Sequence, residues 1–150
     1  MVTTSQEAAN EILDVVPLVM KEIRTEIRNR KSLNVTLFQF RVLSFVDQHK
    51  GTSLSEVADH LGLTLPSTCR IVDGLISTKM MTRQENPDDR RHIQLNITPQ
   101  GLKIFEISHK ESLSYLSKKL DTLSDPEKTI ISNAMKIIRK IFTTDSDGAQ

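Results

Sequence analysis

The most restrictive feature of the sequence is a pair of helix signals with almost no chain between them. Ser53 and Glu56 have the S-x-x-E spacing of a capping box, which predicts the start of a short helix with one apolar face. Gly62 supplies a C-terminal stop, and Thr64 can cap a second helix with Pro66 in its first turn. Two short helices joined by such a tight glycine-containing turn predict a helix-turn-helix.

The second of these helices is expected at residues 65–78 and has two different sides. At 100° per residue, the arc that can pack contains Leu65, Thr68, Cys69, Ile71, Val72, Leu75 and Ile76. The opposite arc presents small polar groups and Arg70 to solvent. Gly74 lies on that opposite arc and costs roughly 1 kcal/mol relative to alanine in a helix.

A β-hairpin is expected directly after this helix. Residues 80–84 can form a strand, and residues 92–98 alternate apolar and polar side chains with the period of a half-buried strand. The connection at residues 85–91 is charged and rich in turn-forming residues. The pattern predicts a hairpin with an exposed tip, which in a winged helix is the wing.

Helices are expected on both sides of this central region. An amphipathic helix at residues 7–30 contains Pro17, which should kink it or end its first piece. Its basic end is interpreted as a solvated face, with phosphate contact as the alternative; it contains Lys21, Arg24, Arg28, Arg30 and Lys31. Further helices are expected at residues 36–48, at 98–121 and after a second capping box at Ser124, and the tail from Thr143 is expected to fray.

Composition restricts the class of protein without identifying it. Twenty basic and 19 acidic residues give a formal charge of +1, so any case for nucleic-acid binding rests on the placement of charges. The first ten residues lack the features of a signal peptide, and no stretch approaches the ~20 apolar residues of a membrane span. With one cysteine and no His/Cys cluster, we expect a cytoplasmic protein with no membrane association, no disulfide, no metal and no cofactor.

The order of these elements and two motifs resemble the MarR family. Residues 61–75 resemble its recognition-helix region, and residues 89–101 resemble its wing signature, a D-x-R followed by a strand, a Leu-Thr pair and a glycine. Here Ile97 replaces the usual leucine. Two further departures are Gly74, where the family often has a long polar residue, and Lys79, where it often has the glycine that enters the wing. The first weakens the case for a base contact at 74, and the second concerns the geometry of the turn.

The resemblance implies a mainly α-helical winged helix-turn-helix with a small β-hairpin wing. Residues 35–121 would form the DNA-binding domain with its linking helix, and residues 1–34 and 122–150 would be dimerisation helices that intertwine with a second chain. The dimerisation residues are expected to be Ile12, Val16, Val19, Ile130, Ile137 and Ile141. The residues alone leave open a small bundle closed within one chain.

The DNA-contacting residues are expected on the recognition helix and the wing. Side chains near the start of such a helix reach base edges in the major groove, and an arginine at the wing tip can enter a narrow minor groove. The resemblance assigns that insertion to Arg91, steadied by Asp89, with Arg90 against phosphate. The full set of expected DNA-binding residues is Thr64, Pro66, Ser67, Arg70, Asp73, Asp89, Arg90 and Arg91.

The function implied by the resemblance is that of a homodimeric, non-enzymatic transcription regulator on a pseudo-palindromic operator in double-stranded DNA. It would act as a repressor released by a small effector, often an aromatic acid or phenol, and activation stays open. The alternative is a winged-helix protein-interaction module that does not bind DNA. Cys69 is interpreted as a small filler at the packed edge of the recognition helix, with an oxidant-sensing thiol as the alternative.

Overall fold

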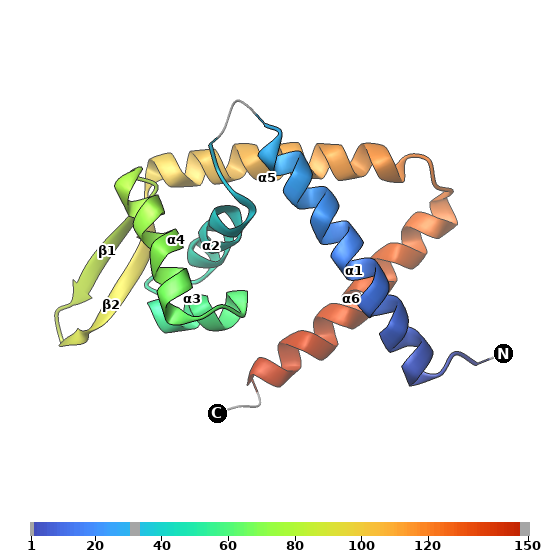
Figure 1. The fold of residues 1–150 in the computed structure, drawn as a ribbon, viewed down its shortest axis with the longest axis horizontal. Helices are drawn as coiled ribbons and strands as arrows, with labels where there is room; N and C mark the ends of the chain where they lie inside the picture. Colours follow the sequence, from blue (N-terminus) through green and yellow to red (C-terminus); the bar gives the residue numbers. More distant parts are fainter. Residues whose placement is uncertain (1, 31–33, 148–150) are drawn as a thin grey trace. The chain divides into compact units, whose positions relative to one another are not determined.

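The structure is a computed structural model that describes the backbone of residues 2–30 and 34–147, and the side chains of these residues except 90–92 and 144–147. Within this part of the chain, the secondary structure consists of helices and one antiparallel hairpin (Figure 1). The elements are α1 (Ser5–Arg28), α2 (Leu37–Gln48), α3 (Leu54–Leu61), α4 (Leu65–Ser77), β1 (Met81–Asn86), β2 (Asp89–Ile97), α5 (Pro99–Leu120) and α6 (Asp125–Asp147). The chain divides into two compact units, Met1–Ser112 and Leu113–Gln150.

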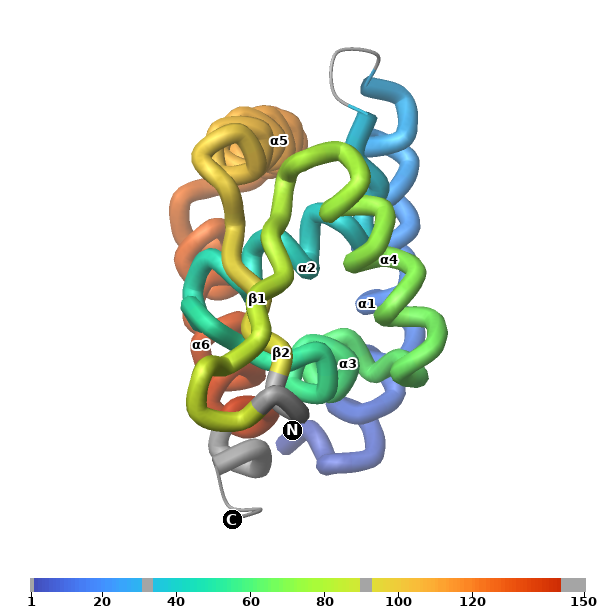
Figure 2. Tube along the Cα trace, turned by 90° about the vertical axis from the view of Figure 1, so that its left-hand side faces the viewer, coloured from blue at the N-terminus to red at the C-terminus, as the bar shows by residue number. Residues whose placement is uncertain are grey.

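The core of the first unit lies among α2, α3, α4 and the base of the hairpin. In Figure 2, which views the hairpin from its own side, α3 and α4 lie to one side of the strands. The core consists of Val35, Val42, Leu43, Val46, Val57, Leu61, Val72, Leu75, Met80, Met81 and Leu95. These aliphatic side chains supply the burial that holds the three short helices together, since so short a helix is not stable alone.

The helix-turn-helix boundaries predicted from the sequence are confirmed. The Ser53 hydroxyl accepts the Glu56 N–H at 3.2 Å, and the Glu56 carboxylate accepts from the hydroxyls of Thr52 and Ser53. Gly62 ends α3 in the left-handed conformation with φ of 67°, where a glycine is least strained. Thr64 caps α4 by accepting the Ser67 N–H at 3.3 Å.

The hairpin is longer than the sequence pattern predicted. The charged residues 85–91 were expected to form the connection, but β1 continues to Asn86 and β2 begins at Asp89, which leaves a turn of two residues. Pairing extends outward because backbone bonds do not depend on the polarity of the side chains, and a bulge at Glu85/Asn86 adjusts the register. Leu95 N–H also donates to Thr52 O at 2.8 Å, which attaches β2 to the loop before α3.

The start of α5 is bonded to the chain that leaves α4. Thr98 donates from its N–H to Met80 O at 3.1 Å and from its hydroxyl to Lys79 O at 2.7 Å, and the same hydroxyl accepts the Gly101 N–H at 3.0 Å. Lys79 adopts a left-handed backbone with φ of 64°, the conformation for which a glycine would be the usual choice. The base of the wing, the end of α4 and the start of α5 therefore form one bonded junction.

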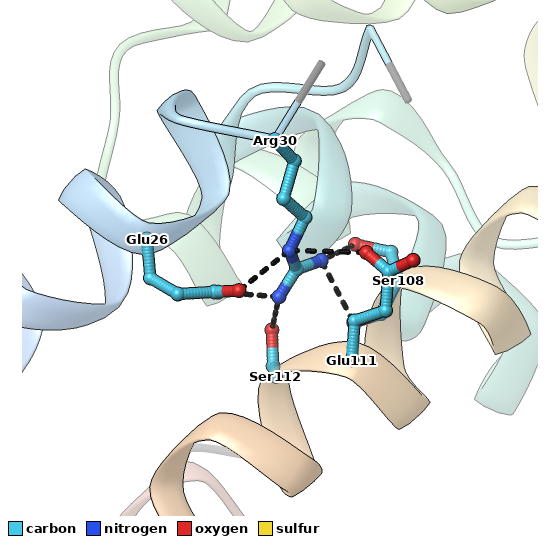
Figure 3. A network of polar contacts seen from close by, with 5 residues as sticks. All are labelled: Glu26, Arg30, Ser108, Glu111 and Ser112. Carbon is cyan, nitrogen blue, oxygen red and sulfur yellow. Dashed lines mark hydrogen bonds and ion pairs between the residues drawn. The ribbon is translucent and has the colours of Figure 1, made fainter. Parts of the chain in front are cut away.

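Two expectations for the first helix can be compared with the structure. Pro17 does not end the helix, which continues through it as one element, because a proline removes one helical hydrogen bond but its φ is compatible with the helix. Arg30, expected in a solvated basic face or against phosphate, is instead buried against α5 (Figure 3). Its partners are Glu26, Ser108, Glu111 and Ser112.

The second unit contains the end of α5 and the whole of α6. The capping box predicted at Ser124 is confirmed: its hydroxyl accepts the Glu127 N–H at 3.3 Å, and the Glu127 carboxylate accepts the Ser124 N–H at 2.9 Å. The bond from the Ser124 N–H, and then a bond of 3.1 Å that the Ser124 hydroxyl donates to the same carboxylate oxygen, lower the pKa of the exposed Glu127 carboxyl. Fraying was predicted from Thr143, but α6 continues to Asp147, because nothing in this polar tail, which lacks proline and has no glycine before 148, interrupts helical bonding.

Candidate nucleic-acid interface

The first turn of α4 presents a small polar surface with one arginine. Thr64, Pro66 and Arg70 are exposed, while Ser67 is half-buried because the Thr64 hydroxyl donates to its Oγ at 3.0 Å. The opposite side is anchored by Thr68, which is fully buried and donates its hydroxyl to Thr64 O at 2.8 Å. The cap and the buried threonine hold this end of the helix rigid, and Arg70 projects from it into solvent.

The packed side of α4 is narrower than the predicted apolar arc. Thr68, Val72 and Leu75 are buried as expected, but Leu65 is 50% exposed. It is the first residue of the helix, beyond the reach of the core, and it lines a depression of about 320 Å³ between α4, the start of α3 and the hairpin. The depression is lined by Ser53, Leu54, Ser55, Leu65, Cys69, Val72, Asp73, Arg83, Ile93 and Leu95.

The backbone of the hairpin places the two wing arginines, Arg90 and Arg91, near its tip. Asp88 N–H donates to the Asn86 side-chain oxygen at 3.0 Å, which closes the turn just before β2. Asp89 is the first residue of β2 and is half-buried. Arg90 and Arg91 follow it on the strand, but their side chains lie outside the described residues, so their predicted roles remain predictions.

An ion pair that the sequence did not predict links α4 to the wing. Asp73 Oδ1 lies 3.8 Å from Arg83 Nη1 on β1, and the Cys69 thiol donates to Asp73 Oδ2 at 3.7 Å. Asp73 was expected to face DNA, and its carboxylate is shared by these two groups. The strand that contains Arg83 was predicted, but no pattern in the sequence indicated which helix residue lies opposite it.

An aromatic stack joins α2 to α3 within the helix-turn-helix. The Phe45 ring stacks on His49 at 4.2 Å and on His60 at 4.5 Å between centroids. Partial burial, then the positive charge of Arg41 and then His49 lower the pKa of His60. His60 therefore resists protonation in the folded protein more than in the unfolded chain.

A second depression lies between the end of α1 and the start of α2. It has a volume of about 310 Å³ and combines basic with apolar lining. Its lining residues are Arg24, Ile27, Arg28, Arg30, Asn34, Val35, Thr36, Leu37 and Phe38. An adjoining hollow shares three of these residues and adds Lys21 and Arg41. The chemistry of this region suits a small anion with an apolar body.

The residues predicted to form a dimer interface are mostly exposed in the single chain. On α1, Val16 and Val19 are exposed and Ile12 is half-buried. On α6, Ile130, Ile137 and Ile141 are exposed, Ile137 by 63%. None of the helices in the described part of the chain combines the length and apolar character needed to cross a bilayer. The structure therefore leaves large aliphatic side chains uncovered on both helices.

Comparisons with known proteins agree with this architecture. Residues 33–92 match the model of the MarR family. The chain is similar to two proteins of Bacillus subtilis (strain 168) that are named as uncharacterized HTH-type transcriptional regulators, YfiV and YpoP. YfiV is 25% identical over 108 residues, which cover 72% of this chain and 68% of YfiV. YpoP is 26% identical over 123 residues, which cover 81% of this chain and 87% of YpoP. A crystal structure of mutant MarR from E. coli complexed with operator DNA aligns with a TM-score of 0.70 and 21% identity, over 91% of this chain and 99% of that chain.

The matched segment contains the helix-turn-helix and the first part of the wing. It runs from before α2 into β2, and the solved structures share the fold well beyond it on both sides. The segment, the relatives and the fold agree: the helix-turn-helix and the first part of the wing match the MarR family, and the chain as a whole is similar to HTH-type transcriptional regulators and has the fold of solved MarR structures.

Proposed function

We propose that the protein regulates transcription by binding an operator in double-stranded DNA as a homodimer. The observation that carries the proposal is that two neighbouring elements are exposed together: the start of α4, which contains Arg70, and the hairpin beside it. The second strand of this hairpin begins just before Arg90 and Arg91. A helix of this kind fits the major groove, where arginine pairs with guanine, and a wing arginine reaches the minor groove. Relatives of the same fold have been solved with DNA, which supports this assignment.

The uncovered aliphatic side chains of α1 and α6 support association with a second copy. Exposed side chains such as Val16, Val19, Ile137 and Ile141 are costly to leave in water, and a second chain would bury them. A two-fold dimer would place two recognition helices on half-sites about one helical turn apart, roughly 10 bp. Such an operator is pseudo-palindromic.

Regulation would work through repression and release. Binding would occlude a promoter, and a small aromatic acid or phenol would bind in the depression between α1 and α2. The guanidinium groups of Arg24 and Arg28 offer charge for a carboxylate or phenolate, and Phe38 offers an exposed ring. Titrating benzoate and phenol into a protein–operator complex tests this: release by either probe, lost in Arg24→Ala, supports an effector site, and no release at millimolar probe contradicts it.

The DNA-binding proposal is tested by Arg91→Ala against Lys110→Ala. Both variants lose one positive charge, but Lys110 is an exposed residue of α5. We expect Arg91→Ala to weaken operator binding by roughly 1–3 kcal/mol and Lys110→Ala to leave it unchanged. Equal affinity of a folded Arg91→Ala variant and the wild type would refute the minor-groove role. A wild type that shows no salt-dependent shift with bulk DNA would favour the protein-interaction module instead.

The dimer is tested by sedimentation and by truncation. A stable monomer at micromolar concentration would refute a functional dimer. Truncation before Ser124 removes α6, so we expect the shortened chain to sediment as a monomer and to lose operator binding. A truncated chain that still dimerises would show that α6 is not needed for the interface.

A further inference from the structure

The side chain of Arg30 lies in a closed network between α1 and α5, although it belongs to the chain just after α1. It is 7% exposed, and its hydrogen bonds satisfy all three guanidinium nitrogens (Figure 3). Nε donates to Glu26 Oε1 at 2.7 Å, Nη1 donates to Ser108 O at 2.9 Å and to its Oγ at 2.8 Å, and Nη2 donates to Ser112 Oγ at 2.5 Å. Nη2 also pairs with Glu26, and Glu111 Oε2 lies 3.3 Å from Nε.

The network fixes the orientation of the Arg30 guanidinium group and not only its distances from its partners. A guanidinium group is planar and its donors form a rigid fork, so simultaneous bonds to a carboxylate on one side and to two serines on the other define the angle of the whole group. Glu26 belongs to α1, whereas Ser108 and Ser112 are one turn apart on α5. The end of α1 is therefore held against one face of α5.

The start of the same helix, α5, is tied to the recognition helix α4. The Thr98 bonds to Lys79 and Met80 attach the start of α5 to the chain that leaves α4. Gly101 approaches the Met80 backbone so closely that a Cβ there would lie 2.0 Å from the carbonyl oxygen. A continuous set of bonded contacts thus runs from the end of α1, through Arg30 and α5, to the end of α4.

We infer that Arg30 is a positioning residue that sets where α4 stands relative to the dimer face of α1, and hence which spacing of DNA half-sites the protein accepts. This inference rests on the proposed dimeric DNA binding. Arg30 also lines the depression between α1 and α2, so a ligand bound there would contact the residue that controls the spacing. Loss of the network would relax the choice of spacing while leaving the DNA-facing side chains intact.

The test uses the full-length protein and DNA alone. Selection from a random-sequence duplex pool first gives the wild-type operator, and duplexes with one or two base pairs added or removed between its half-sites then measure the spacing preference. Arg30→Lys keeps the charge but not the fork. We expect its preference for the natural spacing to fall about tenfold, within the range that coupling between sites spans. Arg139→Lys is the matched control, since it makes the same change at an exposed residue of α6 outside the network, and it should keep the wild-type preference.

Each outcome separates the possibilities. Affinity that falls equally for all spacings would show that Arg30 only stabilises the fold, and would overturn the inference. If Arg30→Lys does not fold, Ser112→Ala removes one bond of the network at the half-buried surface of α5, and an unchanged spacing preference in that variant would overturn the inference as well. If the wild type selects no DNA, the proposed function itself is overturned. This outcome is distinct from a failure of the inference, because the variants are compared only with a wild type that binds DNA.

Discussion

Replacing Gly101 with alanine tests the closest backbone approach at the base of the wing. The added Cβ would lie 2.0 Å from Met80 O and 2.8 Å from its carbonyl carbon, whereas a relaxed carbon–oxygen contact needs about 3.3 Å. The obstacle is backbone, so α5 must move by more than about 1 Å and the Thr98 bond to Met80 O is strained. Overpacking of this severity costs about 3 kcal/mol or more, a hydrogen bond contributes about 1, and alanine returns about 1 through helix propensity, which leaves a loss of roughly 3 kcal/mol.

Urea unfolding at one fixed protein concentration measures this loss, since the stability of a dimer depends on concentration. Gly74→Ala is the matched control: it is also a helical glycine, but its Cβ would meet only the flexible Gln39 Nε2, at 3.4 Å. We expect Gly74→Ala to raise the free energy of unfolding by about 1 kcal/mol, as helix propensity dictates. A Gly101→Ala variant with an unfolding midpoint at or above that of the wild type would refute the reasoning.

Three further predictions concern single residues. Lys79→Gly relieves a left-handed backbone and should stabilise the protein by about 0.5–1 kcal/mol in the same assay, after the entropic cost of glycine, whereas Lys79→Ala should not. The folded-state pKa of His60 lies below its ordinary value, so its contribution to stability is present above about pH 6.5 and decreases as the pH falls below that value. Between pH 7 and pH 5, the free energy of unfolding should therefore depend less on pH in His60→Gln than in the wild type. Cys69→Ser should keep operator binding, because a serine hydroxyl can donate to Asp73 as the thiol does, and peroxide that released only the wild type from DNA would instead identify an oxidant sensor.

The features that the sequence predicts well are those decided within a few residues. The caps at Ser53 and Thr64 and the stop at Gly62 depend on side chains that bond to backbone three residues away, or on a single left-handed residue. The lengths of the hairpin strands and of α6 were underestimated, because polar residues were taken as the end of an element. Backbone pairing and helical bonding continue through polar residues wherever nothing competes with them.

The contacts that the sequence does not predict join residues far apart in the chain. Ser108 and Ser112 bond to Arg30 across 78 and 82 residues, and neither serine has a local signature that distinguishes it from the other serines of the helices. Lys79 shows the opposite case: its departure from the family pattern is visible in the sequence, and the left-handed φ explains why a glycine is usual there. Local departures can therefore be located from the sequence, but long-range partners cannot.

Arg30 and Arg83 show how tertiary placement gives the same residue type opposite roles. Arg30 is bound by two helices and nearly excluded from water, and a buried guanidinium that lost its partners would be strongly destabilising. Arg83 meets Asp73 at 3.8 Å with 42% of its side chain exposed, and a solvated pair of this kind contributes only about 0–1 kcal/mol. A phosphate that approached α4 and the wing could thus replace Asp73 as the partner of Arg83 at little cost, whereas no surface ligand could replace the serines that bind Arg30. The buried arginine therefore fixes the contact between α1 and α5, whereas the exposed one can exchange its partner.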